Sequence, residues 1–127
     1  MHIAHVALWT RDLNEAATFW GRFFGADVGG CYQSKRRPGF VSRFARLPGS
    51  RTTIELMTAP WLADRPASEQ IGWDHLAVSL GDEAAVDALA QRCAAEGLLL
   101  CAPRTTGDGF YEAVIATPDG VRIEVTA

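Results

Sequence analysis

Two histidines and two glutamates stand at matching positions along the chain. His5 lies 50 residues before Glu55, and His75 lies 49 residues before Glu124. Imidazole nitrogens and carboxylate oxygens are common ligands of divalent metal ions. Brought together, these side chains would offer two nitrogens and two oxygens. That mixed set favours a first-row transition metal over magnesium or calcium, with positions left for water or substrate.

The sequences around these four residues also repeat. Residues 3–8 (Ile-Ala-His-Val-Ala-Leu) recur as residues 73–78 (Trp-Asp-His-Leu-Ala-Val), and residues 53–56 (Thr-Ile-Glu-Leu) recur as residues 122–125 (Arg-Ile-Glu-Val). A single glutamate on a strand is most often solvated, and a single histidine is most often a packed residue. Two equivalent pairs, one in each copy, favour a shared role in metal binding. His2 falls outside this pattern and is expected to be solvated.

Hydrophobic periodicity predicts the same order of elements in each half, strand–helix–strand–strand–strand. In the first half Asp12 is the expected helix N-cap and Gly25 the expected stop; in the second half Asp82 and Gly97 take these roles. The predicted helices run to about Phe24 and about Glu96. The predicted strands span residues 2–9, 28–33, 39–47 and 51–58 in the first half, and 73–80, 98–102, 109–117 and 121–126 in the second.

The sequence therefore predicts an α+β fold of two βαβββ modules, residues 1–59 and 73–127, joined by a linker over residues 60–72. Alternation along the strands predicts which side chains share a face. Ile54 and Leu56 are expected to pack under the first helix, as Ile123 and Val125 are under the second. Each His and its Glu then lie on the opposite face of the sheet.

Composition excludes several other classes of protein. The chain has 127 residues, 48% of them hydrophobic, and a net charge of −3, which argues against a nucleic-acid surface. Three cysteines without a CxxC motif argue against a disulfide framework, and Cys93 is expected to be buried on the second helix. Without a signal-peptide pattern or a membrane-length apolar run, a cytoplasmic protein is expected.

The motifs resemble those of the vicinal oxygen chelate superfamily, which includes glyoxalase I, fosfomycin-resistance thiol transferases, extradiol dioxygenases, methylmalonyl-CoA epimerase and bleomycin-resistance proteins. The resemblance covers the whole chain. It is carried by His5-Val6-Ala7-Leu8, Asp12-Leu13, Phe19-Trp20, Thr53-Ile54-Glu55-Leu56, Gly72-Trp73-Asp74-His75-Leu76-Ala77 and Pro118-Asp119-Gly120 before Ile123-Glu124. It implies a cupped mixed sheet that dimerisation completes as a barrel, so a homodimer is expected.

Among these relatives, the His, Glu, His, Glu order is similar to that of short metal-dependent glyoxalase I. The resemblance implies that His5, Glu55, His75 and Glu124 bind nickel, zinc or cobalt, within one chain or across a dimer interface. It also implies proton transfer on an α-hydroxycarbonyl or hemithioacetal substrate through a metal-bound enediolate. Glu124 would shuttle the proton, with Glu55 as its counterpart.

The substrate is less well defined. Trp9 occupies the position where glyoxalase I commonly has a glutathione-binding Arg, and Thr58 and Ala59 stand near that of a glutathione-binding Asn; Arg43 or Arg104 are possible substitutes. Glutathione is therefore only one candidate cosubstrate. An apolar substrate pocket is predicted from Trp9, Phe40, Met57, Trp73 and Phe110. The alternatives are a drug- or metabolite-sequestering resistance protein, a thiol transferase and an extradiol dioxygenase.

Overall fold

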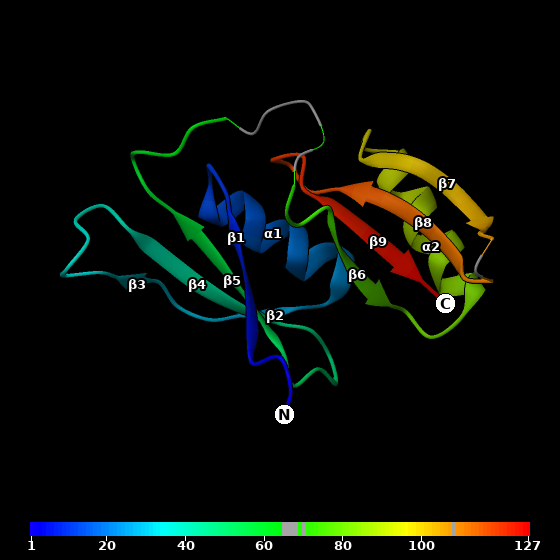
Figure 1. Cartoon of the computed structure of the whole chain (residues 1–127), viewed down its shortest axis with the longest axis horizontal. Helices are drawn as coiled ribbons and strands as arrows, with labels where there is room; N and C mark the ends of the chain where they lie inside the picture. The colour runs from blue at the N-terminus through cyan, green and yellow to red at the C-terminus, as the bar shows by residue number, and fades with distance from the viewer. Residues whose placement is uncertain (65–68, 70, 108) are drawn as a thin grey trace. The chain divides into compact units, whose positions relative to one another are not determined.

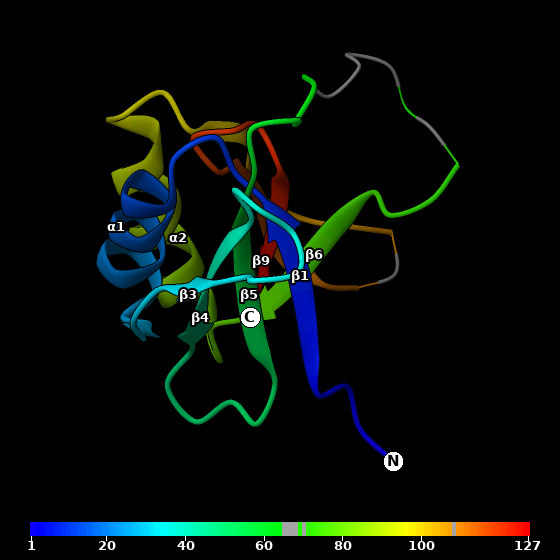
Figure 2. The same ribbon diagram turned by 90° about the vertical axis from the view of Figure 1, so that its left-hand side faces the viewer.

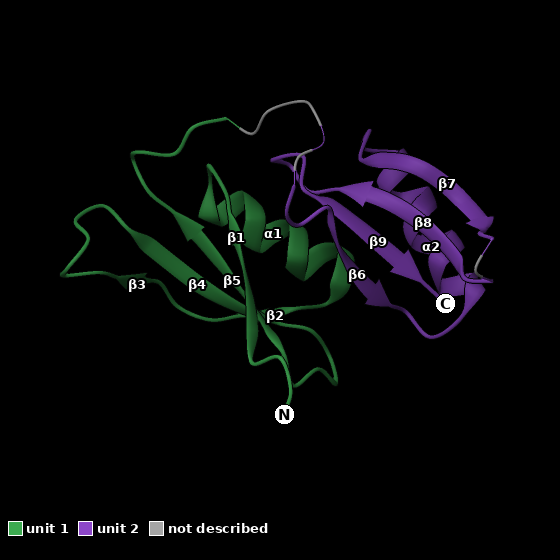
Figure 3. Cartoon of the chain, viewed as in Figure 1, with its two compact units in different colours: residues 1–65 green, residues 66–127 purple. Residues whose placement is uncertain are grey.

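A computed structural model describes residues 1–64, 69, 71–107 and 109–127 of the chain (Figure 1). It divides the chain into two compact units, residues 1–65 and 66–127 (Figure 3). The predicted linker, residues 60–72, lies partly outside the described residues. No helix in the described part of the chain is long and apolar enough to cross a membrane.

Unit 1 consists of one mixed sheet and one helix. Its elements are β1 (His5–Trp9), α1 (Leu13–Phe24), β2 (Asp27–Val28), β3 (Tyr32–Gln33), β4 (Val41–Arg46) and β5 (Thr53–Thr58). The strand order is β1-β5-β4-β2, and β3 also pairs with β4. Strands β1 and β5 are parallel, whereas the other pairs are antiparallel. The first and last strands of the unit are therefore neighbours.

Helix α1 forms where its caps predict. The Asp12 carboxylate accepts hydrogen bonds from the backbone N–H groups of Asn14 and Glu15 at 2.7 and 3.0 Å, and Gly25 ends the helix at φ 64°. The helix packs on β4 and β5, on one side of the sheet (Figure 2). Trp20, 1% exposed, stacks against Phe24 with ring centroids 4.9 Å apart. This aromatic layer is the core of unit 1.

Unit 2 repeats the architecture. Its elements are β6 (His75–Ser79), α2 (Glu83–Ala94), β7 (Leu99–Thr105), β8 (Tyr111–Ala116) and β9 (Arg122–Thr126). The strand order is β6-β9-β8-β7, with β6 and β9 parallel. The Asp82 carboxylate accepts from the Ala85 N–H at 2.8 Å. Cys93 is fully buried, as predicted, and burial raises the pKa of its thiol to about 11.

The structure corrects the extent of several predicted elements. The strand predicted over residues 28–33 is interrupted after Val28. Val28 pairs with Ala45 and Tyr32 pairs with Ser42, so this segment carries one more residue than β4 does between the two pairings, and the regular ladder breaks there. The strand predicted over residues 98–102 continues to Thr105. It passes Pro103 through register irregularities, which an edge strand tolerates because its outer backbone groups have no strand to pair with. Helix α2 ends at Ala94 rather than near Glu96.

The α+β fold of two βαβββ modules is confirmed by these elements. Closure of a barrel by dimerisation stays a prediction. In each unit one face of the sheet is covered by the helix. We call the opposite face, which carries His5 and Glu55 in unit 1 and His75 and Glu124 in unit 2, the open face.

Candidate metal centre

His5 and Glu55 are brought together by the parallel pairing of β1 with β5. Ala7 lies opposite Glu55 in the register, so His5, two residues earlier on the same face, stands beside the glutamate. The His5 Nε2 and Glu55 Oε2 atoms are 3.9 Å apart. The neighbouring side chains Ile54 and Leu56 are 3% and 1% exposed, as expected for the face under α1. The predicted alternation therefore holds on this strand.

The same arrangement recurs in unit 2. Ala77 lies opposite Glu124 in the parallel pairing of β6 with β9. The His75 Nε2 and Glu124 Oε2 atoms are 3.5 Å apart, with Ile123 and Val125 fully buried on the other face. The side chains of Glu55 and Glu124 are 18% and 20% exposed, and those of His5 and His75 are 50% and 37% exposed. Both pairs are thus reachable from solvent.

Both pairs have the donor chemistry of a metal site, and the unit 2 pair also comes close to the required spacing. Two ligand atoms bound to one zinc ion at about 2.1 Å stand about 3.0 to 3.4 Å apart, for octahedral to tetrahedral angles. The unit 2 pair is close to this separation, and the unit 1 pair requires only a small side-chain movement. Within the described residues no group of three or more His, Cys, Asp or Glu is placed to hold a metal. Each unit offers one nitrogen and one oxygen.

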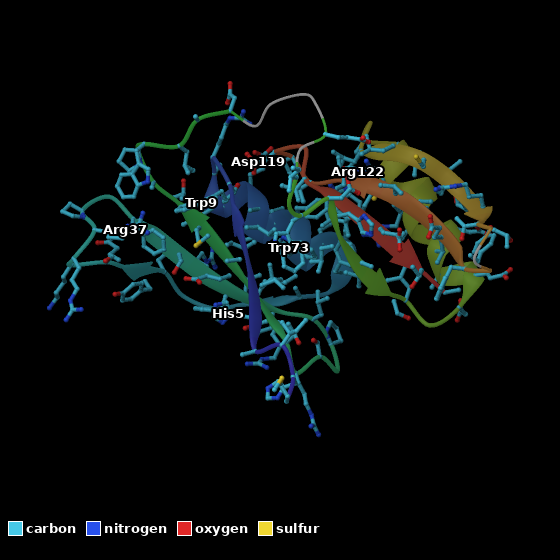
Figure 4. The ribbon with its side chains drawn as sticks, viewed as in Figure 1. His5, Trp9, Arg37, Trp73, Asp119 and Arg122 are labelled. Atoms are coloured by element: carbon cyan, nitrogen blue, oxygen red, sulfur yellow. The ribbon has the colours of Figure 1, made fainter. Side chains whose placement is uncertain are left out.

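Asp74 and Arg122 stand beside His75 and were not among the predicted site residues. The Asp74 Oδ2 atom lies 2.7 Å from His75 Nδ1, and the Arg122 Nη1 atom lies 3.4 Å from Asp74 Oδ1. Asp74 directly precedes His75, and Arg122 lies opposite His75 in the β6–β9 register. The equivalent residues of the first copy are Ala4 and Thr53, so alignment of the two copies would have pointed to both positions. Figure 4 shows Arg122 among the side chains of unit 2.

Three of the five predicted pocket residues share the open face of unit 1. Trp9, labelled in Figure 4, belongs to β1. It lies opposite Met57 in the register, and its ring meets the Phe40 ring edge-on at 5.9 Å. Trp9 is 40% exposed. Ser42, opposite Met57 on the next strand, is 1% exposed, and its hydroxyl has no hydrogen-bond partner among the described residues. This end of the open face is apolar, with one buried hydroxyl.

The other two predicted pocket residues belong to unit 2. Trp73, 81% exposed, lines a shallow depression of about 310 Å³ together with Gly72, Asp74 and His75. Phe110, 55% exposed, lies in the turn before β8, four residues from Val114, the register partner of Glu124. Trp73 thus borders the histidine, whereas Phe110 lies farther along the strand. Membership of a common substrate pocket stays a prediction for all five residues.

Arg43 and Arg104 were considered as substitutes for the glutathione-binding Arg of glyoxalase I, and their surroundings differ. Arg43 donates from Nε to the carbonyl of Gly29, in the segment between β2 and β3, at 2.8 Å. Arg104 donates from Nη2 to Glu112 at 3.0 Å. The β8–β9 register places Glu112 and Glu124 on the same face of the sheet. Of these two arginines, Arg104 is therefore the one that lies on the open face of its unit.

Comparison with known families matches these observations. A sequence profile of the Glyoxalase/Bleomycin resistance protein/Dioxygenase superfamily matches residues 2–125. The chain belongs to this superfamily. The predicted membership of the vicinal oxygen chelate proteins is therefore confirmed. Members of this superfamily commonly use divalent metals.

Solved structures of the superfamily share the fold at low sequence identity. A glyoxalase/bleomycin resistance/dioxygenase domain from Frankia sp. EAN1pec superposes with a TM-score of 0.85 at 19% identity, covering 99% of this chain and 96% of that one. Glyoxalase I from Zea mays gives 0.78 at 18% identity, over 98% of this chain and 44% of that one. The fosfomycin-resistance protein FosX from Listeria monocytogenes gives 0.75 at 19% identity, over 99% and 92%. A search of curated protein sequences found no match.

Proposed function

We propose that the protein is a metal-dependent, glyoxalase I-like lyase or isomerase acting on an α-hydroxycarbonyl or hemithioacetal substrate. The observation that carries this proposal is the matched His–Glu pair on the open face of each unit, 3.9 Å apart in unit 1 and 3.5 Å apart in unit 2. A glutamate on the solvated face of a sheet does not require a histidine beside it. The same His–Glu combination nevertheless occurs at equivalent register positions in both units, which supports a shared role in binding metal. Membership of the superfamily supports the same reading.

His5, Glu55, His75 and Glu124 would hold the metal, within one chain or between the chains of a homodimer. The nitrogen and oxygen donors favour nickel, zinc or cobalt. When bound, such an ion supplies Lewis-acid stabilisation of negative charge that develops on a substrate oxygen.

Glu124 is the group we assign to proton transfer. Its carboxylate is 20% exposed, so it is partly desolvated and still open to substrate. It would take a proton from the carbon beside the substrate oxygen and return it to the neighbouring carbon, with Glu55 in the equivalent position of unit 1. General acid–base catalysis of this kind typically contributes about 10²–10⁴-fold to the rate.

Glutathione is one candidate cosubstrate and is tested directly by the assay. The position of its expected Arg is held by Trp9, which favours an apolar contact there. Arg104 already pairs with Glu112, which is 7% exposed, so it would have to share its guanidinium with a substrate carboxylate. These two features favour a substrate with less negative charge than glutathione supplies.

The proposal includes a homodimer in the cytoplasm. Cys31, Cys93 and Cys101 are all free, which suits a reducing compartment.

The first experiment measures metal content and turnover together. The purified protein is analysed for bound nickel, zinc and cobalt and assayed with methylglyoxal and glutathione. The same measurements on Glu124→Gln should show metal retained or weakened and turnover lowered by about 10²–10⁴-fold. Glu69→Gln, at an exposed position outside both sheets, is the charge-matched control and should match the wild type. Full turnover by Glu124→Gln would contradict the assignment.

A sequestering protein is the second candidate, and the open face of unit 1 favours it. Trp9, Tyr32 and Phe44 are 40, 59 and 43% exposed on this face, an aromatic surface suited to holding an apolar ligand. This candidate predicts ligand binding that is unchanged by a chelator. Metal-free protein that binds apolar ligands and never acquires metal on reconstitution would favour it over the enzyme.

A further inference from the structure

The two histidines of the proposed centre have unequal surroundings. His75 has a carboxylate on the side of its ring away from Glu124: Asp74 Oδ2 is 2.7 Å from Nδ1, whereas Glu124 Oε2 is 3.5 Å from Nε2. The Asp74 side chain is itself contacted by Arg122 through its other oxygen. A chain of contacts therefore runs from Arg122 through Asp74 and His75 to Glu124.

His5 lacks this support. Ala4 stands where unit 2 has Asp74, and Thr53 stands where unit 2 has Arg122. Within the described part of the chain His5 has no hydrogen bond to its Nδ1; its ring meets Phe44 edge-on at 5.9 Å. An aromatic edge restricts the ring but does not select which nitrogen carries the proton. The His5–Glu55 separation is also the wider of the two.

A carboxylate against one nitrogen of a neutral imidazole fixes the other as the lone-pair donor. Asp74 can only accept, so in the neutral ring Nδ1 carries the hydrogen and Nε2 presents its lone pair. Nε2 then faces the Glu124 carboxylate, and two acceptors stand 3.5 Å apart. A cation between them would relieve that repulsion.

We infer that Asp74, held by Arg122, is a positioning residue that sets the Nδ1–H tautomer of His75 and makes the His75–Glu124 pair the stronger half of the metal site. The inference rests on the proposed function, since it presumes that the pair binds a metal. The His5–Glu55 pair is the weaker half, with a ring free to adjust its tautomer. Loss of an outer partner of a metal-bound histidine typically lowers metal affinity about 10–100-fold.

Nitrogen-15 NMR of the metal-free protein tests the tautomer directly. At about pH 8.5, above the usual histidine range, His75 should be the Nδ1–H tautomer and His5 should be mixed. Asp74→Ala should convert His75 to a mixture, and Asp74→Asn, which keeps an acceptor, should largely preserve the wild-type signal. Ala4→Asp should shift His5 toward the Nδ1–H form. An Nε2–H tautomer or an imidazolium at His75 in the wild type would overturn the inference.

Cobalt titration followed by absorption spectroscopy tests the inequality of the two halves. Asp74→Ala should weaken cobalt binding about 10–100-fold, and Asp27→Ala, an exposed carboxylate on β2, should leave it unchanged. His75→Ala should weaken binding more than His5→Ala. If the wild type binds cobalt and Asp74→Ala binds it with the same affinity, this inference is overturned and the proposed function stands. Absence of cobalt binding by the wild type would overturn both.

Discussion

The buried hydroxyl of Ser42 leads to a prediction of unusual sign: Ser42→Ala should stabilise the metal-free protein. Ser42 is 1% exposed on the open face of unit 1, and its Oγ atom has no hydrogen-bond partner in the described part of the chain. Its strand neighbours on that face are Met57 and Tyr32, neither of which hydrogen-bonds to it. Folding therefore removes this hydroxyl from water without replacing the hydrogen bonds it loses.

The magnitude follows from two opposing terms. An unsatisfied buried polar group costs about 1–3 kcal/mol, and the alanine variant recovers that cost. The oxygen leaves an unfilled volume of about 10–15 Å³, which costs about 0.3 kcal/mol at about 24 cal/mol per Å³. We expect a net stabilisation of about 1 kcal/mol, or a rise in melting temperature of about 3–5 °C for a chain of this size.

Urea unfolding after chelator treatment is the assay, with Thr10→Val as the matched control. Thr10 is also buried, at 5% exposed, but its hydroxyl donates to the Asp12 carbonyl at 3.1 Å and accepts from the Asp12 N–H. Removing that hydroxyl should destabilise the protein by about 1 kcal/mol or more. A loss of stability in Ser42→Ala comparable to that of Thr10→Val would refute the reasoning, because it would mean that the Ser42 hydroxyl is paired in solution.

Three further predictions concern the core and the loops. Trp20→Ala should lower the free energy of unfolding by about 3–5 kcal/mol in urea titration, because this ring is 1% exposed and stacked in the core. Gly39→Ala should cost at least about 1 kcal/mol, since φ is +88° and a Cβ would lie 2.8 Å from Pro60, and it should cost more than Gly49→Ala, where φ is also positive but nothing lies within 4 Å. The free energy of unfolding should fall by up to about 2–3 kcal/mol as pH rises from about 9 toward 11, because the Cys93 thiol loses its proton in the unfolded chain and retains it in the folded protein. Cys93→Ala should flatten this part of the stability profile measured by urea unfolding.

The face on which each proposed metal ligand lies could be predicted because a strand has a strict period of two. Once Ile54 and Leu56 were assigned to the core, Glu55 had to point away from α1, and the structure bears this out. The helix starts were equally accessible, since an Asp side chain before a helix satisfies N–H groups that the helix itself leaves unpaired, and Asp12 does so. These are local rules, and they need no knowledge of the rest of the chain.

The interruption between β2 and β3 could not be read from periodicity. Gly29 and Gly30 reveal that the backbone is permissive there, but not that Gly29 bonds to Phe44 and accepts the Arg43 guanidinium on its carbonyl. The interruption is a shift of register against β4, and that register depends on how the segment pairs with a strand elsewhere in the sequence. The extension of β7 past Pro103 also depends on the rest of the sheet, because proline is tolerated in a strand at the edge of a sheet or at a bulge, and β7 is an edge strand with register shifts.

The Asp74–His75 contact could be predicted only in part from the sequence. The residue types and their adjacency are plain in the sequence, and comparison of the two copies singles out Asp74 against Ala4. What the sequence does not supply is the direction of the side chain, since successive residues at the start of a strand ordinarily point to opposite faces. The structure shows that Asp74, just before β6 begins, folds back toward the ring of His75.

If the proposed function holds, the differences between the two copies of the repeat predict different contributions from the two units. The residues four beyond each histidine and two beyond each glutamate are register partners: Trp9 with Met57 in unit 1, and Ser79 with Thr126 in unit 2. Unit 1 therefore combines an unsupported histidine with the apolar pair Trp9 and Met57, and unit 2 combines a supported histidine with the polar pair Ser79 and Thr126 at the equivalent positions. On the proposed function, the His75–Glu124 pair of unit 2 would bind metal more tightly, and the apolar surface of unit 1 would contact the apolar part of a substrate. Exchange of Trp9 should then alter substrate preference with little effect on metal affinity, and exchange of Asp74 should do the reverse.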